Sequence, residues 1–243
     1  MKQSDNITVC FIASNMTKYL FPYEPVIEQA KKIGRVIVNV DTDSIDNTVE
    51  AIRMTKVDII ESAWGQSASA GREWLLTQKQ AVVGASETKF LLYLDIDELF
   101  DDEGIEWLKK IVDEDLHGFS GVRFKSYNFY GDLKHRMPDD AGGHWSAVIV
   151  RLARKGVKFI SGSDGFGLSL NDMETIPSPH RIFHYSHVRP RQVWHEKNTM
   201  MFARYNKVYS NMQIPWDQVQ KFEGVHPDII NQHLHLFEQG GDL

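Results

Sequence analysis

Short apolar runs alternate with amphipathic stretches over the first hundred residues of the chain. The runs are rich in Val, Ile, Leu and Phe, and the stretches between them carry apolar residues at helical spacing. We expect strands over residues 7–13, 35–40, 57–61 and 90–95. Helices are expected over 25–33, from the capping residues 43–48 to about 55, and over 71–84. This order predicts βαβ units in a mostly parallel sheet, whose ligands bind beyond the carboxyl ends of the strands.

The pattern changes after Phe119. Residues 121–131 and 146–160 alternate apolar and polar positions and are rich in β-branched residues, so we expect an antiparallel portion that continues the same sheet. A further strand is expected over 180–188. A long helix is expected over 192–209, and a last one over 228–238. Because no internal repeat and no long linker interrupts the chain, a single domain over residues 1–243 is predicted.

Composition narrows the class of protein. The chain has 243 residues, 42% of them apolar and 25% charged, as is usual for a soluble globular protein. Its one cysteine, Cys10, excludes an intramolecular disulfide and a cysteine-based metal cluster, which favours a reducing compartment. The N-terminus lacks the apolar core of a secretion signal, and no run has the length of a membrane span. We therefore expect a cytoplasmic protein without a transmembrane segment.

The charge is unevenly distributed. The net charge of −6 argues against a general nucleic-acid binder, because affinity for phosphate backbones needs clustered Lys and Arg. Residues 95–115, however, contain ten acids and two lysines, whereas residues 181–207 contain six Lys or Arg and one Glu. The two segments either surround a metal ion and a phosphate or form two solvated faces of opposite sign.

Three carboxylates directly follow the strand expected to end at residue 95. Alternation along an extended backbone predicts that Asp95 and Asp97 point to one side and Glu98 to the other. Two converging carboxylates without cysteine suit Mg²⁺ or Mn²⁺ and leave positions open for phosphate oxygens. The alternative is that the two aspartates only end a strand and that Glu98 begins a helix.

A second group of acids ends the strand over residues 35–40. Asp41 and Asp43 can accept hydrogen bonds from a base or a ribose at the carboxyl edge of the sheet, or they only cap the following helix and form a turn. The sequence lacks Gly-x-Gly-x-x-Gly after the first strand, Gly-Lys-Ser/Thr and Gly-x-Ser-x-Gly. Classical dinucleotide-binding, P-loop and nucleophile-elbow sites are therefore excluded.

The order of these motifs resembles that of family 2-like inverting glycosyltransferases, in particular a bacterial and phage branch. The resemblance rests on VDTDSIDNT, GREWLLTQKQAVVGAS, LLYLDIDELF, the stretch from GHWSAV to SGSDGFG, and RIFHYSHVRPRQVWHEK, and it covers about residues 7–207. It implies an α/β fold of the GT-A type: a Rossmann-like, mostly parallel sheet with an antiparallel C-terminal portion and flanking helices. It further divides the chain into a nucleotide-sugar-binding half (1–100), an acceptor half (101–210) and a C-terminal helical segment (211–243).

The resemblance also implies roles for individual residues. Asp41 and Asp43 correspond to contacts with the base and ribose, although Thr42 or Asp43 replaces the glycine of the family's Asp-Gly-Ser-x-Asp pattern. Asp97 corresponds to the metal ligand, and Asp95 to a contact with the ribose or a metal-bound water. His184 corresponds to a further metal ligand or a diphosphate contact; the alternative is a packed, hydrogen-bonded histidine.

The alternation of side chains along a strand is expected to separate the two histidines of the HYSH segment. His184 and His187 are three residues apart, so on an extended strand they are expected to point to opposite faces and not to share one ion.

The remaining implied contacts lie on the acceptor side and after the last strand. Asp164, in SGSDGFG, is the implied catalytic base, with Asp172 and Glu174 next in line; the alternative is an Asp-Gly turn. The residues implied to bind the donor, in addition to Asp41, Asp43 and Asp95, are Arg72, Arg189 and Arg191, with Lys197 as a further cation. The segment RPRQVWHEK is equally compatible with an ordinary polar start of a helix.

The implied function is a hexosyl- or pentosyltransferase that uses Mn²⁺ or Mg²⁺ and a nucleotide-sugar donor, most simply a UDP-sugar. The acceptor is a saccharide or, as a minority alternative, a hydroxylated base in DNA. A nucleotidyltransferase and a non-catalytic nucleotide-sugar-binding protein remain as alternatives, and a homo-oligomer is left open. The expected location is the cytoplasm, which is the host cytoplasm if a phage encodes the chain.

Overall fold

The fold was analysed in a computed structural model of the chain. The structure describes residues 4–65, 71–142, 147–159, 165–167, 174–205 and 218–237, without the side chains of 71–74, 202, 204 and 205.

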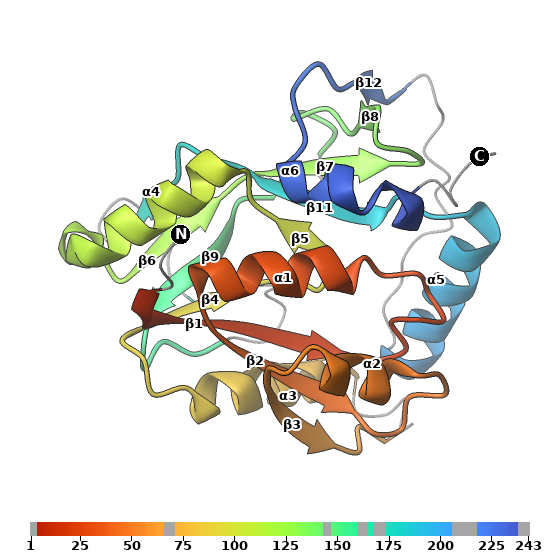
Figure 1. Ribbon diagram of the computed structural model, residues 1–243, viewed down its shortest axis with the longest axis horizontal. Helices are drawn as coiled ribbons and strands as arrows, with labels where there is room; N and C mark the ends of the chain where they lie inside the picture. Colours follow the sequence, from red (N-terminus) through yellow and green to blue (C-terminus); the bar gives the residue numbers. More distant parts are fainter. Residues whose placement is uncertain are drawn as a thin grey trace.

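A seven-stranded sheet forms the centre of the molecule, in the order β10-β6-β9-β4-β1-β2-β3 (Figure 1). Its strands are β1 (Ser4–Ala13), β2 (Gly34–Asp41), β3 (Asp58–Ser62), β4 (Phe90–Tyr93), β6 (Gly121–Phe124), β9 (Ile149–Arg154) and β10 (Thr175–Pro177). The strands β1 to β4 pair in parallel, whereas β9 lies antiparallel between β4 and β6. The structure therefore confirms the α/β class, with a mostly parallel sheet and an antiparallel portion.

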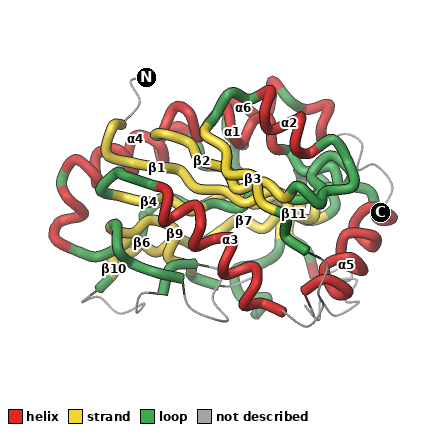
Figure 2. Tube along the Cα trace, turned by 90° about the horizontal axis from the view of Figure 1, so that it is seen from below, coloured by secondary structure: helices red, strands yellow, loops and turns green. Residues whose placement is uncertain are grey.

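Helices cover both faces of this sheet. They are α1 (Tyr23–Ile33), α2 (Thr48–Met54), α3 (Gly71–Ala85), α4 (Asp102–Asp113), α5 (Arg191–Tyr205) and α6 (Asp228–Gln232). Figure 2 shows α1, α2 and α4 on one side of the sheet and α3 on the other. Alternate residues of β1 face these two layers: Val9 and Phe11 pack in the core beneath α1 and α4, whereas Cys10 packs with Val82 and Val83 of α3.

A second sheet lies beside the first, in the order β12-β8-β7-β11-β5. Its strands are β5 (Glu98–Leu99), β7 (Ser126–Tyr130), β8 (His135–Arg136), β11 (Ile182–His187) and β12 (Gln220–Lys221). The prediction that an antiparallel portion continues the first sheet holds for β6 and β9 and is wrong for β7, which lies beside β11 in the second sheet. The reason is aromatic packing: the ring of Phe129 stacks on Phe183 and Tyr185, with centroid distances of 6.0 and 4.9 Å, and Phe222 packs edge-on against it.

The C-terminal region differs in one further respect from the expected pattern. Instead of one helix over 228–238, the structure has α6 and then a 3-10 turn at Leu234–Leu236. The larger hydrophobic core runs from Ile7 to Phe237 and contains residues of both sheets. Within the part of the chain that the structure describes, no helix has the length and apolar character to cross a membrane.

Candidate active site

A cavity of about 250 Å³ opens beyond the carboxyl ends of β1 and β4, between the two sheets and α5. Its walls include Ile12 near the end of β1, Ser14 just after this strand, the turn after β4, and one side of α5. The charged or titratable side chains among its described lining residues are Lys79, Asp95, Asp97, Glu98, Arg151, His184, His187 and Lys197. The edge of the sheet at which the sequence predicted a ligand therefore carries a cavity with mixed charge.

A tight turn carries the three carboxylates that follow β4. The strand ends at Tyr93, and the backbone N–H of Glu98 donates to the carbonyl of Asp95 at 3.0 Å, so the chain reverses at Ile96 and Asp97. The prediction that Asp95 and Asp97 share one side while Glu98 points away is wrong, because it assumed an extended backbone. In the turn, Asp95 and Glu98 lie together and Asp97 points elsewhere.

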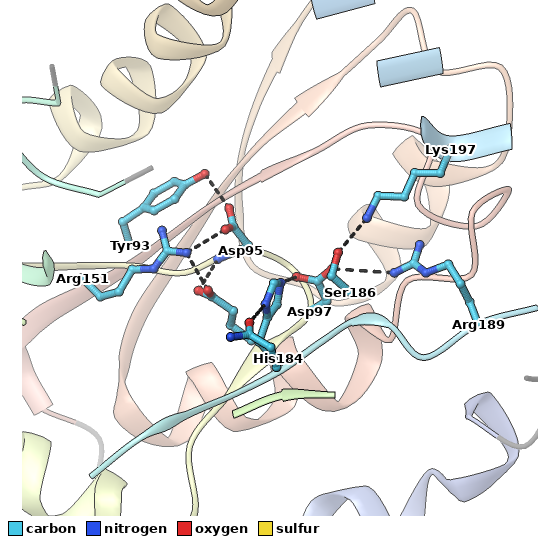
Figure 3. Close-up of polar contacts among 10 residues, drawn as sticks. Tyr93, Asp95, Asp97, Arg151, His184, Ser186, Arg189 and Lys197 are labelled. Carbon is cyan, nitrogen blue, oxygen red and sulfur yellow. Dashed lines mark hydrogen bonds and ion pairs between the residues drawn. The ribbon is translucent and has the colours of Figure 1, made fainter. Parts of the chain in front are cut away.

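Asp95 faces the cavity in a fixed orientation (Figure 3). Its Oδ2 accepts a hydrogen bond from Nη2 of Arg151 at 2.7 Å, and its Oδ1 accepts one from the hydroxyl of Tyr93 at 3.2 Å. Burial raises the pKa of Asp95, but the charges of Arg151, Lys79 and His184 outweigh burial and hold this pKa well below its usual range. Asp95 is therefore ionised and hydrogen-bonded on both oxygens.

Asp97 is buried and lies between two nitrogen groups. Its Oδ1 is 3.5 Å from Nε2 of His184, and its Oδ2 is 3.7 Å from Nη2 of Arg189. Burial raises the pKa of Asp97, but the hydrogen bond and charge of His184, together with Lys197 and Arg189, lower it overall. On the other side of the imidazole ring, Nδ1 of His184 lies 2.8 Å from Oδ1 of Asn128, which leaves Nε2 directed at Asp97.

Asp97 and His184 fit a divalent cation as a pair of ligands. A carboxylate oxygen and an imidazole nitrogen face each other across 3.5 Å, and both are ligands for Mn²⁺. Among the described residues, no third His, Cys, Asp or Glu completes a metal cluster. Mg²⁺ and Mn²⁺ sites that act on phosphates need few protein ligands, because water and phosphate oxygens complete the shell.

His187 also lines the cavity, together with His184. The two rings lie 6.5 Å apart between centroids. The prediction that they point to opposite faces is therefore wrong. The register of β11 against β7 shifts between these two residues, and such an irregularity breaks the strict alternation of side chains.

The three predicted cations after β11 have three different positions. Arg189 is buried: its Nη1 donates to the carbonyl of Tyr19 at 2.5 Å, and its guanidinium lies over the ring of Phe21 at 4.4 Å. Burial lowers the pKa of Arg189 to about 10, so the side chain stays charged at neutral pH. Lys197 reaches the cavity, where its Nζ donates to Oγ of Ser186 at 2.9 Å. Arg191 instead lines a separate, open groove of about 900 Å³ along α5.

Asp41 and Asp43 organise the loops at the end of β2. Asp41 is fully buried, accepts backbone N–H groups of Asp43 and Trp64 at 3.0 Å each, and accepts the hydroxyl of Ser14 at 2.8 Å. Asp43 accepts the N–H of Gly65 at 2.7 Å. Neither is among the described residues that line the cavity, whereas Ser14 and Trp64 are. The structure thus brings both acids to the predicted edge, where Asp41 holds Ser14 and Trp64 at the cavity wall and Asp43 holds the adjacent Gly65.

Three predicted residues are placed only in part or not at all, and a fourth lies away from the cavity. Asp164 and Asp172 lie outside the described residues, and Arg72 lies in the first turn of α3 with its side chain outside them. Glu174 is exposed immediately before β10 and is not among the described cavity residues. The identity of the catalytic base therefore stays a prediction.

Gly165, the neighbour of Asp164, packs closely against β9. A Cβ added at Gly165 would lie 2.4 Å from Cγ2 of Ile149 and 2.5 Å from the carbonyl oxygen of Val150. Because Ile149 lines the cavity, the chain next to Asp164 is anchored beside it.

We expect Gly165→Ala to destabilise the protein by about 1–3 kcal/mol, because a close-packed strand must move to make room. The measurement is the free energy of unfolding in urea. Gly84→Ala is the control: no atom lies within 4 Å of its added Cβ, and in α3 the change should stabilise by about 0.5 kcal/mol. Equal free energies of unfolding for the two variants would contradict the close packing of Gly165 against β9.

Sequence reasoning missed Arg151, Glu98 and Lys79 as site residues. All three are buried, with exposed fractions of 1, 2 and 4%. The signal was present for Arg151, which interrupts the apolar run of β9, and a buried charge in a strand needs a partner. Which partner it has depends on the pairing of β9 with β4, and no local pattern gives that.

The chain was compared with known proteins. No protein-family model and no curated protein matches it. Among solved structures it is similar to residues 1–349 of S. aureus TarS, with 20% identity over 51% of this chain and 36% of that one and a TM-score of 0.39. The same part of TarS in complex with UDP gives 19% identity over the same shares and a TM-score of 0.40.

A third similar structure is glucosyl-3-phosphoglycerate synthase from Mycobacterium tuberculosis in complex with Mn²⁺, UDP and glucosyl-3-phosphoglycerate. Its identity is 18% over 52% of this chain and 44% of that one, with a TM-score of 0.33. The chain thus spans less than half the length of each of these structures.

Proposed function

We propose that this protein is a metal-dependent, inverting glycosyltransferase of the GT-A type, which transfers a sugar from a UDP-sugar to a hydroxyl acceptor. The observation that carries the proposal is the pair Asp97 and His184, 3.5 Å apart beside the cavity at the carboxyl edge of the sheet. A ligand site at this edge is the general rule for parallel α/β sheets. Aspartates in a turn after the central strand β4 agree with the motif order of the sequence.

The charges of the cavity support a metal and a diphosphate as joint ligands. The acids Asp95, Asp97 and Glu98 oppose the permanent cations Lys79, Arg151 and Lys197. A divalent cation or a nucleoside diphosphate alone would disturb this balance, whereas the two together add little net charge. We therefore expect each ligand to strengthen the binding of the other.

The residues divide the chemistry among them. Asp97 and His184 would hold a divalent cation, which would supply positive charge to the departing nucleoside diphosphate. Lys197, on the α5 wall of the cavity, adds a second positive charge. Asp95 is ionised and accepts hydroxyls of the donor. Inversion needs a base on the sugar face opposite the diphosphate, and we assign this role to Asp164, which takes the proton of the attacking hydroxyl.

Donor turnover tests the function. With UDP-glucose and other UDP-sugars, we expect slow release of UDP that requires Mn²⁺ or Mg²⁺ and stops with a chelator. Release of pyrophosphate from a nucleoside triphosphate and a sugar phosphate would instead indicate a nucleotidyltransferase. Binding of UDP-sugars without turnover, with every acceptor tried, would indicate a binding protein.

For the acceptor we favour a saccharide over DNA. Four of the cations clustered in the sequence after residue 180 have side chains that the structure describes, and these four do not form one patch: Arg181 pairs with Asp139, Arg189 is buried, and Arg191 and Lys197 line different hollows. A duplex needs several cations on one accessible face.

We therefore expect almost no salt dependence of acceptor binding. The experiment titrates a neutral saccharide and, separately, a duplex carrying hydroxylated pyrimidines, each at saturating donor and metal and between about 50 and 200 mM salt. If DNA is the acceptor, the logarithm of its association constant falls linearly with the logarithm of the salt concentration, with a slope of about −0.9 per phosphate contacted. Such a slope would overturn the preference for a saccharide.

A further inference from the structure

Arg151 occupies an unusual position, in the middle of an apolar strand of the central sheet. Its neighbours Val150 and Leu152 are buried core residues, and the Arg151 side chain itself is 2% exposed. A guanidinium at such a position needs a partner, because an isolated buried charge is very costly. The partner is the turn after β4, to which Arg151 reaches from the adjacent strand β9 (Figure 3).

Glu98 is the second half of this arrangement. Its side chain is also 2% exposed, and Nη2 of Arg151 donates to its Oε1 at 2.5 Å. Its Oε2 accepts the backbone N–H of Asp95 at 2.9 Å. Both oxygens of Glu98 are therefore used inside the protein, and the turn is closed by a side chain as well as by its backbone.

Stability alone does not explain the pair. Replacement of a buried ion pair by apolar residues of similar volume is often neutral or stabilising, so a fold gains little by keeping one. What the pair does provide is orientation, because the same Nη2 atom holds Oδ2 of Asp95, while the hydroxyl of Tyr93 holds Oδ1. Asp95 is thereby fixed with its remaining lone pairs available at the cavity wall.

The two aspartates have separate partners. The side chain of Asp95 contacts Arg151, whereas that of Asp97 contacts His184 and Arg189, and the two halves adjoin where Glu98 and His184 lie opposite each other in the pairing of β5 with β11. A guanidinium 2.7 Å from Asp95 also opposes the approach of a divalent cation to that carboxylate.

We propose that Arg151 and Glu98 are positioning residues that preset Asp95 for the hydroxyls of the nucleotide sugar, and that the divalent cation binds to Asp97 and His184 without them. This inference rests on the proposed function and divides its site into two independent halves. One half fixes the donor's hydroxyls, and the other fixes the metal.

The test removes both buried charges together, so that the net charge of the site does not change. In the double variant Arg151→Met/Glu98→Gln, we expect the affinity for UDP in the presence of Mn²⁺, measured by calorimetry, to fall by about 10- to 100-fold. The affinity for Mn²⁺ alone, measured by electron paramagnetic resonance, should stay within about threefold of wild type. Loss of a group that orients a metal ligand would lower this affinity by about 10- to 100-fold.

Controls keep the outcome interpretable. Arg181→Met/Asp139→Asn removes an exposed pair of the same kind away from the cavity and should change neither affinity. Arg151→Lys keeps the charge, but the lysine side chain is one bond shorter than the path to Nη2 and its ammonium does not reach both carboxylates as Nη2 does. A partial loss of UDP affinity is therefore expected even if the double variant does not fold. Circular dichroism and thermal unfolding of each variant report its folding.

Three results would overturn the inference. Wild-type affinity for UDP in a folded double variant or in Arg151→Lys would exclude the positioning role. An equal loss of Mn²⁺ and UDP binding would show that the two halves are not independent. If the wild-type protein binds neither UDP nor Mn²⁺, the proposed function itself fails and the inference fails with it, a result distinct from the first two.

Discussion

Asp97→Asn should abolish nearly all sugar transfer while the protein remains folded. The substitution keeps the size of the side chain but removes the charge that faces His184 across 3.5 Å. A bound metal contributes several kcal/mol to the stabilisation of developing charge, so we expect a loss of about 10³-fold in kcat/KM. The measurement is transfer at several Mn²⁺ concentrations, where the variant should also need far more metal.

The fold is expected to survive this change for a structural reason. The turn that carries Asp97 is held through its backbone, whose carbonyl accepts the N–H of Tyr185 at 2.9 Å, and the substitution leaves that bond intact. Asp113→Asn, at the exposed end of α4, is the isosteric control and should retain full activity. Unchanged turnover and metal dependence in Asp97→Asn would reject the site.

Asp164→Asn should slow transfer by about 10²-fold or more, the usual effect of losing a general base. Donor binding should survive, because the assigned role concerns the acceptor's proton only. The prediction rests on the order of motifs and on Gly165, whose close packing against Ile149 anchors the neighbouring chain beside the cavity. Single-turnover rates, together with UDP affinity, separate the chemical step from binding.

Glu174→Gln is the matched comparison for this prediction. Glu174 is a second candidate from the sequence, but it is exposed before the edge strand β10, so its loss should have little effect. If Asp164→Asn turns over at the wild-type rate, the base lies elsewhere, and Asp172 is then the next residue to change.

Much of the first half of the fold was predictable from the sequence. The strands and helices up to Tyr93 lie within a few residues of their expected bounds, because each strand is a short apolar run and each helix has one apolar face. The same local signals identified β11 and α5. They did not reveal the second sheet, because alternation identifies a strand but not its neighbour; the contacts of Phe129 with Phe183 and Tyr185 decide that.

The site was predictable to a similar depth. Asp97 and His184 do lie together, as the motifs implied, although they are far apart in the sequence. The predicted directions of side chains were wrong where the backbone departs from an ideal strand. These places are the turn between Asp95 and Glu98 and the shifted register before His187. Arg151 was missed because its role arises only when β9 pairs with β4.

The pairing of β5 with β11 determines which insertions and deletions the candidate site can tolerate. His184 lies directly opposite Glu98 in this antiparallel pair, so the distance from imidazole to Asp97 is set by register. Deleting one residue within β11 would place an aromatic neighbour there instead. By contrast, insertions confined to the loops between Leu99 and Ile182, outside the strands β6, β7 and β9, leave that register unchanged. For the proposed glycosyltransferase, these loops are therefore the natural place to introduce new acceptor preferences without moving the pair Asp97 and His184.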